Sequence, residues 1–238
     1  DDWLLYAGNL IVRRTPDHGK NRLLCLDAAG GALRWQKEVR VKHMVAAEEK
    51  IFCLTAEGKS TKELLCLDAK DGTEKWRVGA TAGWGQLLCH FDGVLVFGSQ
   101  TRGGRKTSAA KALGVSADDG KRLWSFEYGL LGHGGRPSKV YCIDGLAWVN
   151  RSKPSGWVGL DVKTGKEERF LKEAAPCWSR NLCADNRATE RFILTRTMLF
   201  VDVKSGDYLR PWGVKNGCGY GSVMPANGLI YVFPPQGQ

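Results

Sequence analysis

The chain has 238 residues, of which 43% are hydrophobic and 25% are charged, and its formal net charge is +10. This length suffices for one domain with a substantial core, and no apolar run approaches the ~18 residues of a membrane-spanning helix. The charge suggests a nucleic-acid ligand, but basic residues are scattered along the whole chain instead of forming the stripe typical of a groove reader. We therefore expect no specific nucleic-acid binding, no transmembrane segment and a general preference for anionic ligands.

A motif recurs along the chain: an apolar run, an Asp-containing turn that ends in glycine, and a polar segment that ends in an aromatic residue. The clearest copies are residues 23–35 and 64–76, whose glycines and tryptophans are both 41 residues apart. Copies at this spacing indicate a repeat architecture. The turn glycines are Gly31, Gly72, Gly120, Gly165 and Gly206, and the tryptophans that end the first three copies are Trp35, Trp76 and Trp124.

Each copy predicts a β-hairpin with a buried inner strand and a solvated outer strand. The glycine supplies the positive φ of a tight turn, and the Asp before it is placed to bond its own backbone. A second turn lies upstream of each copy, as at residues 91–96 and 143–148, and precedes another apolar strand. Two hairpins per repeat make a four-stranded antiparallel sheet, the size of one propeller blade. A β-sandwich with coincidental spacing is the alternative.

We therefore predict an all-β chain that forms a single β-propeller domain of four-stranded antiparallel blades over residues 1–238. The chain holds about five to six blades, of which the first lacks a clear first strand. Two arrangements follow: the C-terminal strands complete the first blade, or the chain is a fragment of a larger, seven- or eight-bladed ring. The predicted blades are residues 1–39, 40–80, 81–128, 129–172 and 173–212, with a half-blade at 213–238.

Few residues match a catalytic or metal-binding pattern. The sequence contains no His-Glu-x-x-His and no Gly-x-Ser-x-Gly, the motifs of zinc proteases and serine hydrolases. His43 and His133 lie in the segments that begin the second and fourth blades. Because the first strand of a propeller blade lines the central channel, both are candidate channel-facing residues. The alternative for each is a loop histidine fixed by a hydrogen bond.

The eight cysteines form no Cys-x-x-Cys, so a zinc ribbon, a redox motif and a haem attachment site are unsupported. Cys25 and Cys66 hold equivalent inward positions and are predicted to pack as small apolar groups. Three further cysteines lie in the irregular C-terminal part. We expect them to form a disulfide with one another or with a cysteine beyond the given sequence. The candidate disulfide residues are Cys177, Cys183 and Cys218, whereas Cys53, Cys89 and Cys142 lie in predicted strands.

The repeated Asp-x-x-x-Gly-x-x-x-Trp pattern resembles the tryptophan docking motif of the pyrroloquinoline-quinone (PQQ)-like β-propellers. In that family the tryptophan packs between adjacent blades, so the resemblance implies a structural docking role for Trp35, Trp76, Trp124 and the turn glycines. The fourth and fifth copies depart from the pattern, because Arg169 and Arg210 stand where tryptophan is expected. The C-terminal run is also similar to exported PQQ-like repeat proteins of planctomycete-type bacteria.

The PQQ-like family includes quinoprotein dehydrogenases and non-catalytic propellers such as the outer-membrane assembly lipoprotein BamB. The dehydrogenases carry adjacent cysteines and calcium ligands, whereas this sequence has no Cys-Cys pair. The resemblance therefore implies a non-enzymatic scaffold of the periplasm or cell envelope that binds a protein or an anionic ligand, with no catalytic, cofactor or metal residue. One alternative is a partial quinoprotein dehydrogenase that binds PQQ and calcium. Another is a carbohydrate-binding propeller that stacks sugars on Trp84, Trp148, Trp157 and Trp178.

Overall fold

The computed structural model describes residues 2–14, 21–57, 60–79, 84–101, 109–129, 140–172, 187–195, 199–209, 223–226 and 229–232. Every regular element in these ranges is a β-strand. The strands form five four-stranded antiparallel sheets and one two-stranded sheet. The all-β prediction and the four-stranded antiparallel unit are therefore confirmed.

Each sheet takes its strands in chain order. The first sheet contains β1 (Asp2–Tyr6), β2 (Asn9–Arg14), β3 (Arg22–Asp27) and β4 (Leu33–Glu38). The second contains β5 (Val41–Ala47), β6 (Lys50–Glu57), β7 (Ser60–Asp68) and β8 (Glu74–Gly79). The third contains β9 (Trp84–Phe91), β10 (Val94–Thr101), β11 (Ala109–Ser116) and β12 (Arg122–Glu127).

The remaining sheets are formed by the C-terminal part of the described residues. The fourth contains β13 (Tyr141–Ile143), β14 (Leu146–Ser152), β15 (Ser155–Asp161) and β16 (Glu167–Lys172). The fifth contains β17 (Arg187–Ala188), β18 (Phe192–Leu194), β19 (Phe200–Asp202) and β20 (Tyr208–Leu209). A C-terminal hairpin is formed by β21 (Val223–Ala226) and β22 (Leu229–Val232).

The first sheet has a first strand, contrary to the prediction that this blade lacks one. β1 pairs with β2 over its whole length, from Asp2 opposite Arg13 to Tyr6 opposite Asn9. The strand escapes sequence analysis because the run from Trp3 to Tyr6 has no polar alternation, which is the usual signal of a strand with one solvated face. Since β1 fills this place and β21 pairs only with β22 among the described strands, the C-terminal strands do not complete the first sheet.

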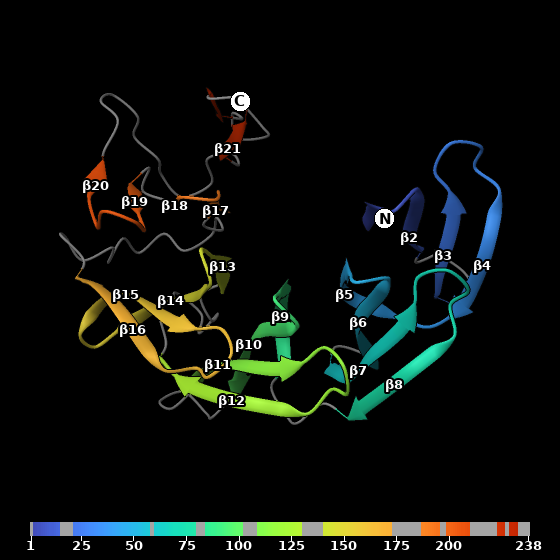
Figure 1. Cartoon of the computed structure of the whole chain (residues 1–238), viewed down its shortest axis with the longest axis horizontal. Coiled ribbons are helices and arrows are strands. Elements are labelled where there is room, and N and C mark those ends of the chain that lie inside the picture. Colours follow the sequence, from blue (N-terminus) through green and yellow to red (C-terminus); the bar gives the residue numbers. More distant parts are fainter. Residues whose placement is uncertain are drawn as a thin grey trace.

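The sheets follow one another around an arc (Figure 1). The first strand of each sheet lies on the inner side of the arc and the fourth strand lies on the outer rim. The inner strands contact one another in succession, β1 with β5, β5 with β9 and β9 with β13. Radial repetition of four-stranded sheets with this strand order is the arrangement of propeller blades.

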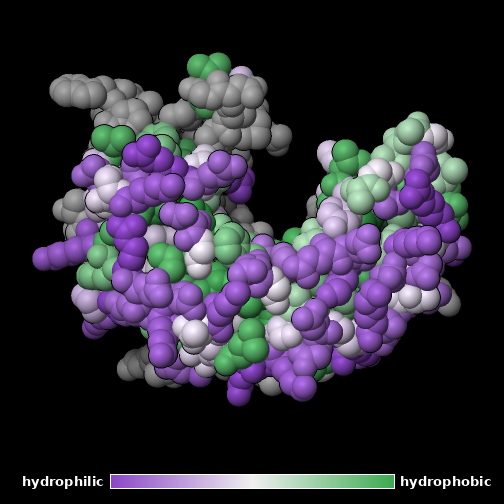
Figure 2. Space-filling model, viewed as in Figure 1, coloured by the Kyte–Doolittle hydropathy of each residue, from purple (hydrophilic) through white to green (hydrophobic). Residues whose placement is uncertain are grey.

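The hydrophobic cores lie between neighbouring sheets, so the central strands are buried on both faces. Phe52 to Leu54 on β6 and Leu64 to Leu67 on β7 are fully buried, which explains why these strands read as continuous apolar runs. The outer strands are mostly exposed, as in β4 and β12, and Figure 2 shows mainly hydrophilic residues along the outer rim. Cys25 and Cys66 are fully buried, as predicted.

Two tryptophans proposed as sugar-stacking residues lie in the core between the fourth and fifth sheets. Trp148 and Trp157 are each 1% exposed and pack with Ile193 and Val201. A buried indole offers no face to a carbohydrate in solution, so the stacking role is wrong for these two residues. Trp178 and the side chain of Trp84 lie outside the described residues.

Candidate functional site

The turn between the third and fourth strands has the same geometry in all five sheets. In the second sheet, the N–H of Gly72 donates to the carbonyl of Asp68 (3.0 Å), and the N–H of Asp68 donates to the carbonyl of Thr73 (2.8 Å). The Asp68 carboxylate accepts the N–H of Lys70 (2.8 Å). As the sequence predicts, the turn glycine has a positive φ of 73°. The φ values of the equivalent residues Gly31, Gly120, Gly165 and Gly206 are 73°, 73°, 69° and 84°.

In each sheet, the turn between the third and fourth strands is hydrogen-bonded to the turn between the first and second strands. The donor is the second residue of the former turn. In the second sheet that residue is Ala69, whose N–H donates to the carbonyl of Glu49 (2.8 Å). The third sheet repeats the bond between Ala117 and Gly93 (2.9 Å). The hydrogen bond fixes the backbone of Ala69, so its own carbonyl is held at a constant place at the end of the sheet.

Those carbonyls accept a hydrogen bond from the tryptophan of the preceding sheet. Trp35 Nε1 donates to the Ala69 carbonyl (3.1 Å), and Trp76 Nε1 donates to the Ala117 carbonyl (3.2 Å). Trp124 Nε1 donates to the carbonyl of Val162 (2.7 Å). An indole N–H that is removed from water needs such a partner, and the docking tryptophans therefore link the first four sheets in series.

The ring of each tryptophan also lies against the next sheet's turn glycine. A Cβ atom placed on Gly72 would be 2.7 Å from the Trp35 ring, and one on Gly165 would be 2.6 Å from the Trp124 ring. Such distances are shorter than van der Waals contact, so only glycine allows the ring to approach this closely. The turn glycine thus serves both the positive φ of its own turn and the packing of the neighbouring sheet.

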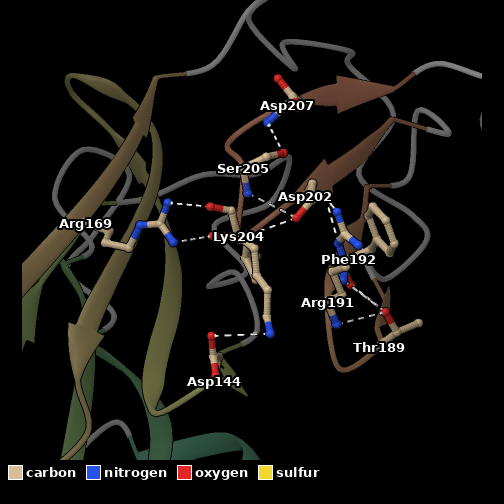
Figure 3. Close-up of polar contacts among 10 residues, drawn as sticks. Asp144, Arg169, Thr189, Arg191, Phe192, Asp202, Lys204, Ser205 and Asp207 are labelled. Atoms are coloured by element: carbon tan, nitrogen blue, oxygen red, sulfur yellow. Dashed lines mark hydrogen bonds and ion pairs between the residues drawn. The ribbon is translucent and has the colours of Figure 1, made fainter.

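The fourth junction uses an arginine where the other three use a tryptophan. Arg169 Nη1 donates to the carbonyl of Val203 (2.7 Å) and Nη2 donates to the carbonyl of Lys204 (2.9 Å) (Figure 3). Val203 is the fifth sheet's equivalent of Ala69. The sequence shows Arg169 as a departure from the motif, but the structure places its guanidinium on the equivalent carbonyl. Arg210, the next departure, lies outside the described residues.

A buried carboxylate lies beside this arginine junction, and sequence analysis did not single it out. Asp202 accepts hydrogen bonds from Arg191 Nε (2.8 Å) and from the N–H groups of Lys204 (2.9 Å) and Ser205 (3.3 Å) (Figure 3). The Arg191 guanidinium and the two N–H groups lower the pKa of Asp202 to about 2. Lys204 Nζ also lies 3.9 Å from a carboxylate oxygen of Asp144 in the fourth sheet.

The first sheet carries the same turn, but none of the described residues docks on it. Apart from Gly31 and its two chain neighbours, no described residue has an atom within 4 Å of the place where a Cβ on Gly31 would be. Trp3 and Leu5, on the β1 face that points away from the second sheet, are 67% and 64% exposed. The first sheet is therefore covered by a neighbouring sheet on one face only, within the part of the chain that the structure describes.

The other predicted site residues are placed only in part. His43 lies on β5, an inner strand, and is half-buried, so its exposure to a central channel stays a prediction. His133, Cys177, Cys183 and Cys218 lie outside the described residues. Within the described ranges, no cluster of three or more His, Cys, Asp or Glu residues is arranged to hold a metal ion, and no helix could cross a membrane.

Four-stranded sheets around an arc, joined by residues that dock on the next sheet's turn, define a β-propeller of the PQQ-like type. Residues 5–127 match the family model described as outer membrane protein assembly factor BamB. The chain therefore belongs to the BamB-type family of PQQ-like propeller repeat proteins. The matched residues include all three docking tryptophans. No curated protein matches the sequence.

Solved structures agree on the fold. BamB from Moraxella catarrhalis is 15% identical, with a TM-score of 0.58 over 97% of this chain and 69% of that chain. A europium-containing methanol dehydrogenase is 14% identical, with a TM-score of 0.57 over 87% of this chain and 49% of its own. Quinohemoprotein alcohol dehydrogenase from Comamonas testosteroni is 14% identical, with a TM-score of 0.58 over 97% of this chain and 45% of its own. The chain thus spans about half of the two dehydrogenases, and the resemblance to planctomycete-type proteins stays a prediction.

Proposed function

We propose that this protein is a non-enzymatic, extracytoplasmic scaffold that binds another protein, with a cell-envelope location. The observation that carries the proposal is the match to the BamB family over residues 5–127. This match covers both sides of the first two junctions and the tryptophan of the third, so it concerns the architecture of the propeller. A rigid ring of sheets is suited to binding because it can present loops in fixed positions.

The charges on the outer rim support a protein partner over a nucleic acid. Several rim cations are already paired with carboxylates of their own sheet, as Lys75 is with Asp68 (2.8 Å) and Arg77 with Glu63 (2.8 Å). Paired cations neutralise little phosphate charge, and phosphate neutralisation supplies most of non-specific nucleic-acid affinity. The net charge of +10 still favours an anionic partner surface.

The proposal is tested by binding and by thermal shift in the same preparation. The purified chain is cross-linked in envelope extract, the captured protein is identified and expressed, and the complex is measured by light scattering with and without a chelator. We expect a stoichiometric complex that survives the chelator, and no change in melting temperature with PQQ and calcium. A saturable rise in melting temperature with PQQ and calcium, together with dye-linked alcohol oxidation, would establish the quinoprotein alternative instead.

A further inference from the structure

Two cysteines from different sheets meet on the inner side of the arc. Cys89 lies on β9, the inner strand of the third sheet, and Cys142 lies on β13, the inner strand of the fourth. These two strands contact each other. The Cys89 thiol donates to the carbonyl of Val140 (3.6 Å), two residues before Cys142, and the Cys142 thiol lies close enough to Cys89 for each thiol to shift the pKa of the other.

The other described cysteines are not arranged in this way. Cys25, Cys53 and Cys66 are fully buried. Cys53 packs in the core between the first and second sheets, whereas Cys66 packs in the core between the second and third. Cys53 and Cys66 therefore point to opposite faces of one sheet and cannot bridge. Cys89 and Cys142 are only half-buried, which leaves them within reach of a small oxidant.

We propose that Cys89 and Cys142 form a disulfide that joins the third and fourth sheets at their inner strands. Because β9 and β13 are in contact and the Cys89 thiol already reaches the backbone two residues from Cys142, we expect that only local adjustment is needed to bring the sulfur atoms to the ~2 Å length of an S–S bond. The same two sheets are joined nearer the outer rim by Trp124, which docks on Val162. A disulfide would therefore link the third and fourth sheets at their inner strands as well as near the outer rim.

The local electrostatics distinguish the two thiols. Hydrogen bonds from the Cys142 side chain and backbone lower the pKa of Cys89. The pKa of Cys142 is raised, because its proton is shared with Cys89 and because burial disfavours its charged form. Thiol–disulfide exchange begins with a thiolate, so we expect Cys89 to react first.

The reaction needs an external disulfide as oxidant, such as oxidised glutathione or a protein disulfide of an oxidising compartment. The Cys89 thiolate attacks this disulfide, forms a mixed disulfide and releases one thiolate. Cys142 then loses its proton, attacks the Cys89 sulfur and releases the second thiolate. Two cysteine thiols and one external disulfide give the Cys89–Cys142 disulfide and two external thiols.

Peptide mapping tests the cross-link directly, because trypsin separates the two cysteines. Cys89 is the only cysteine in residues 78–102, and Cys142 is the only one in residues 140–151. The whole chain is treated with oxidised glutathione, alkylated, digested without reductant and analysed by mass spectrometry. We expect the two peptides linked to each other, and released by dithiothreitol. Recovery of both peptides only as alkylated or glutathionylated single species would overturn the proposal.

Matched variants establish specificity and the order of attack. Cys25→Ala removes a buried thiol elsewhere and should leave the 78–102/140–151 cross-link unchanged. Cys142→Ala should leave Cys89 as a mixed disulfide with glutathione, whereas Cys89→Ala should leave Cys142 mostly unmodified. Equal glutathionylation of the two single variants would contradict the role of Cys89 as the first nucleophile.

A thermal measurement tests the structural consequence. The cross-linked wild-type chain should melt about 5–10 °C above the reduced chain, as expected for a disulfide that closes a long loop in a domain of this size. Dithiothreitol should remove the difference in the wild type and should have no such effect on Cys142→Ala. A cross-linked chain that melts no higher than the reduced chain would show that the bond strains the junction and would overturn its stabilising role.

Discussion

The junction after the first sheet and the junction after the fourth sheet join neighbouring sheets at the same turn position, but they use different side chains. Trp35 combines one hydrogen bond to the Ala69 carbonyl with a ring packed against Gly72. Arg169 makes two hydrogen bonds to consecutive carbonyls, but among the described residues no ring lies against the Gly206 turn, and a Cβ on Gly206 would meet only Leu171, at 3.3 Å. The tryptophan junction depends on apolar packing, whereas the arginine junction depends on charge-assisted hydrogen bonding.

This difference shows which part of the junction is essential to the geometry. In four successive junctions the accepting carbonyl belongs to the same position, in Ala69, Ala117, Val162 and Val203. The donor changes from indole to guanidinium, and the accepting backbone does not. A planar side chain with an N–H at the right reach is therefore sufficient to dock, and the aromatic ring adds packing energy.

The largest expected effect is that of removing a tryptophan. Trp76→Ala should lower the free energy of unfolding by about 3–5 kcal/mol, the usual loss for a packed aromatic side chain, because both the ring contact and the bond to Ala117 disappear. Lys75→Ala is the control, since its ion pair with Asp68 is solvent-exposed and such pairs contribute little to stability. Urea unfolding followed by circular dichroism measures both. Equal, small losses would show that the tryptophan does not stabilise the junction.

A pair of glycine substitutions separates docking from backbone strain. Gly31→Ala and Gly72→Ala both place alanine at a φ of 73°, which costs about 1–2 kcal/mol. Only Gly72→Ala also forces the Trp35 ring away, so it should cost about 1–3 kcal/mol more. If the two variants unfold with the same dependence of free energy on urea concentration, the difference between their unfolding midpoints gives the energy of the docking contact. Identical losses would mean that the ring moves aside without penalty.

The arginine junction should be weaker and sensitive to side-chain shape. Arg169→Ala should lower the free energy of unfolding by about 1.5–3 kcal/mol, the range for hydrogen bonds to a charged donor. Arg169→Lys keeps the charge but offers no planar fork, and it should recover only part of this loss. Glu168→Ala, at an exposed neighbouring position, is the control in thermal or urea unfolding. Full recovery by lysine would show that charge alone holds the junction.

The smallest expected effect is a pH dependence at the arginine junction. Because the folded pKa of Asp202 is about 2 and an unfolded Asp titrates near about 3.9, the unfolded chain binds protons first as the pH falls. The stability that Asp202 contributes is therefore present above about pH 4 and is lost as the pH falls toward about 2.

A matched pair of variants isolates this contribution. Asp202→Asn should flatten the dependence of the melting temperature on pH between about 4 and 2. Asp119→Asn is the control: its pKa is also lowered to about 2, but its side chain is 44% exposed in a surface ion pair, where solvent screening weakens the interaction. A larger effect from Asp119→Asn would contradict the importance of burial at Asp202.

The sequence by itself determined the strand pattern and the repeat. The turn from Asp68 to Gly72 is specified locally, because glycine tolerates positive φ and aspartate bonds nearby N–H groups. The resemblance of the repeated pattern to the tryptophan docking motif implied that Trp35, Trp76 and Trp124 stand at the junctions. The first strand was missed because a strand buried or apolar on both faces gives no alternating signal.

Only the tertiary structure decided what each junction residue contacts. The partners of Trp35 and Arg169 lie 34 residues further along the chain, and no local pattern reports a contact over that separation. The same limit applies to the cysteine pair. Cys89 and Cys142 are 53 positions apart in the sequence, so no local pattern indicates that they meet. Local propensity fixes turns and strands, whereas the packing of one sheet on the next selects the partners.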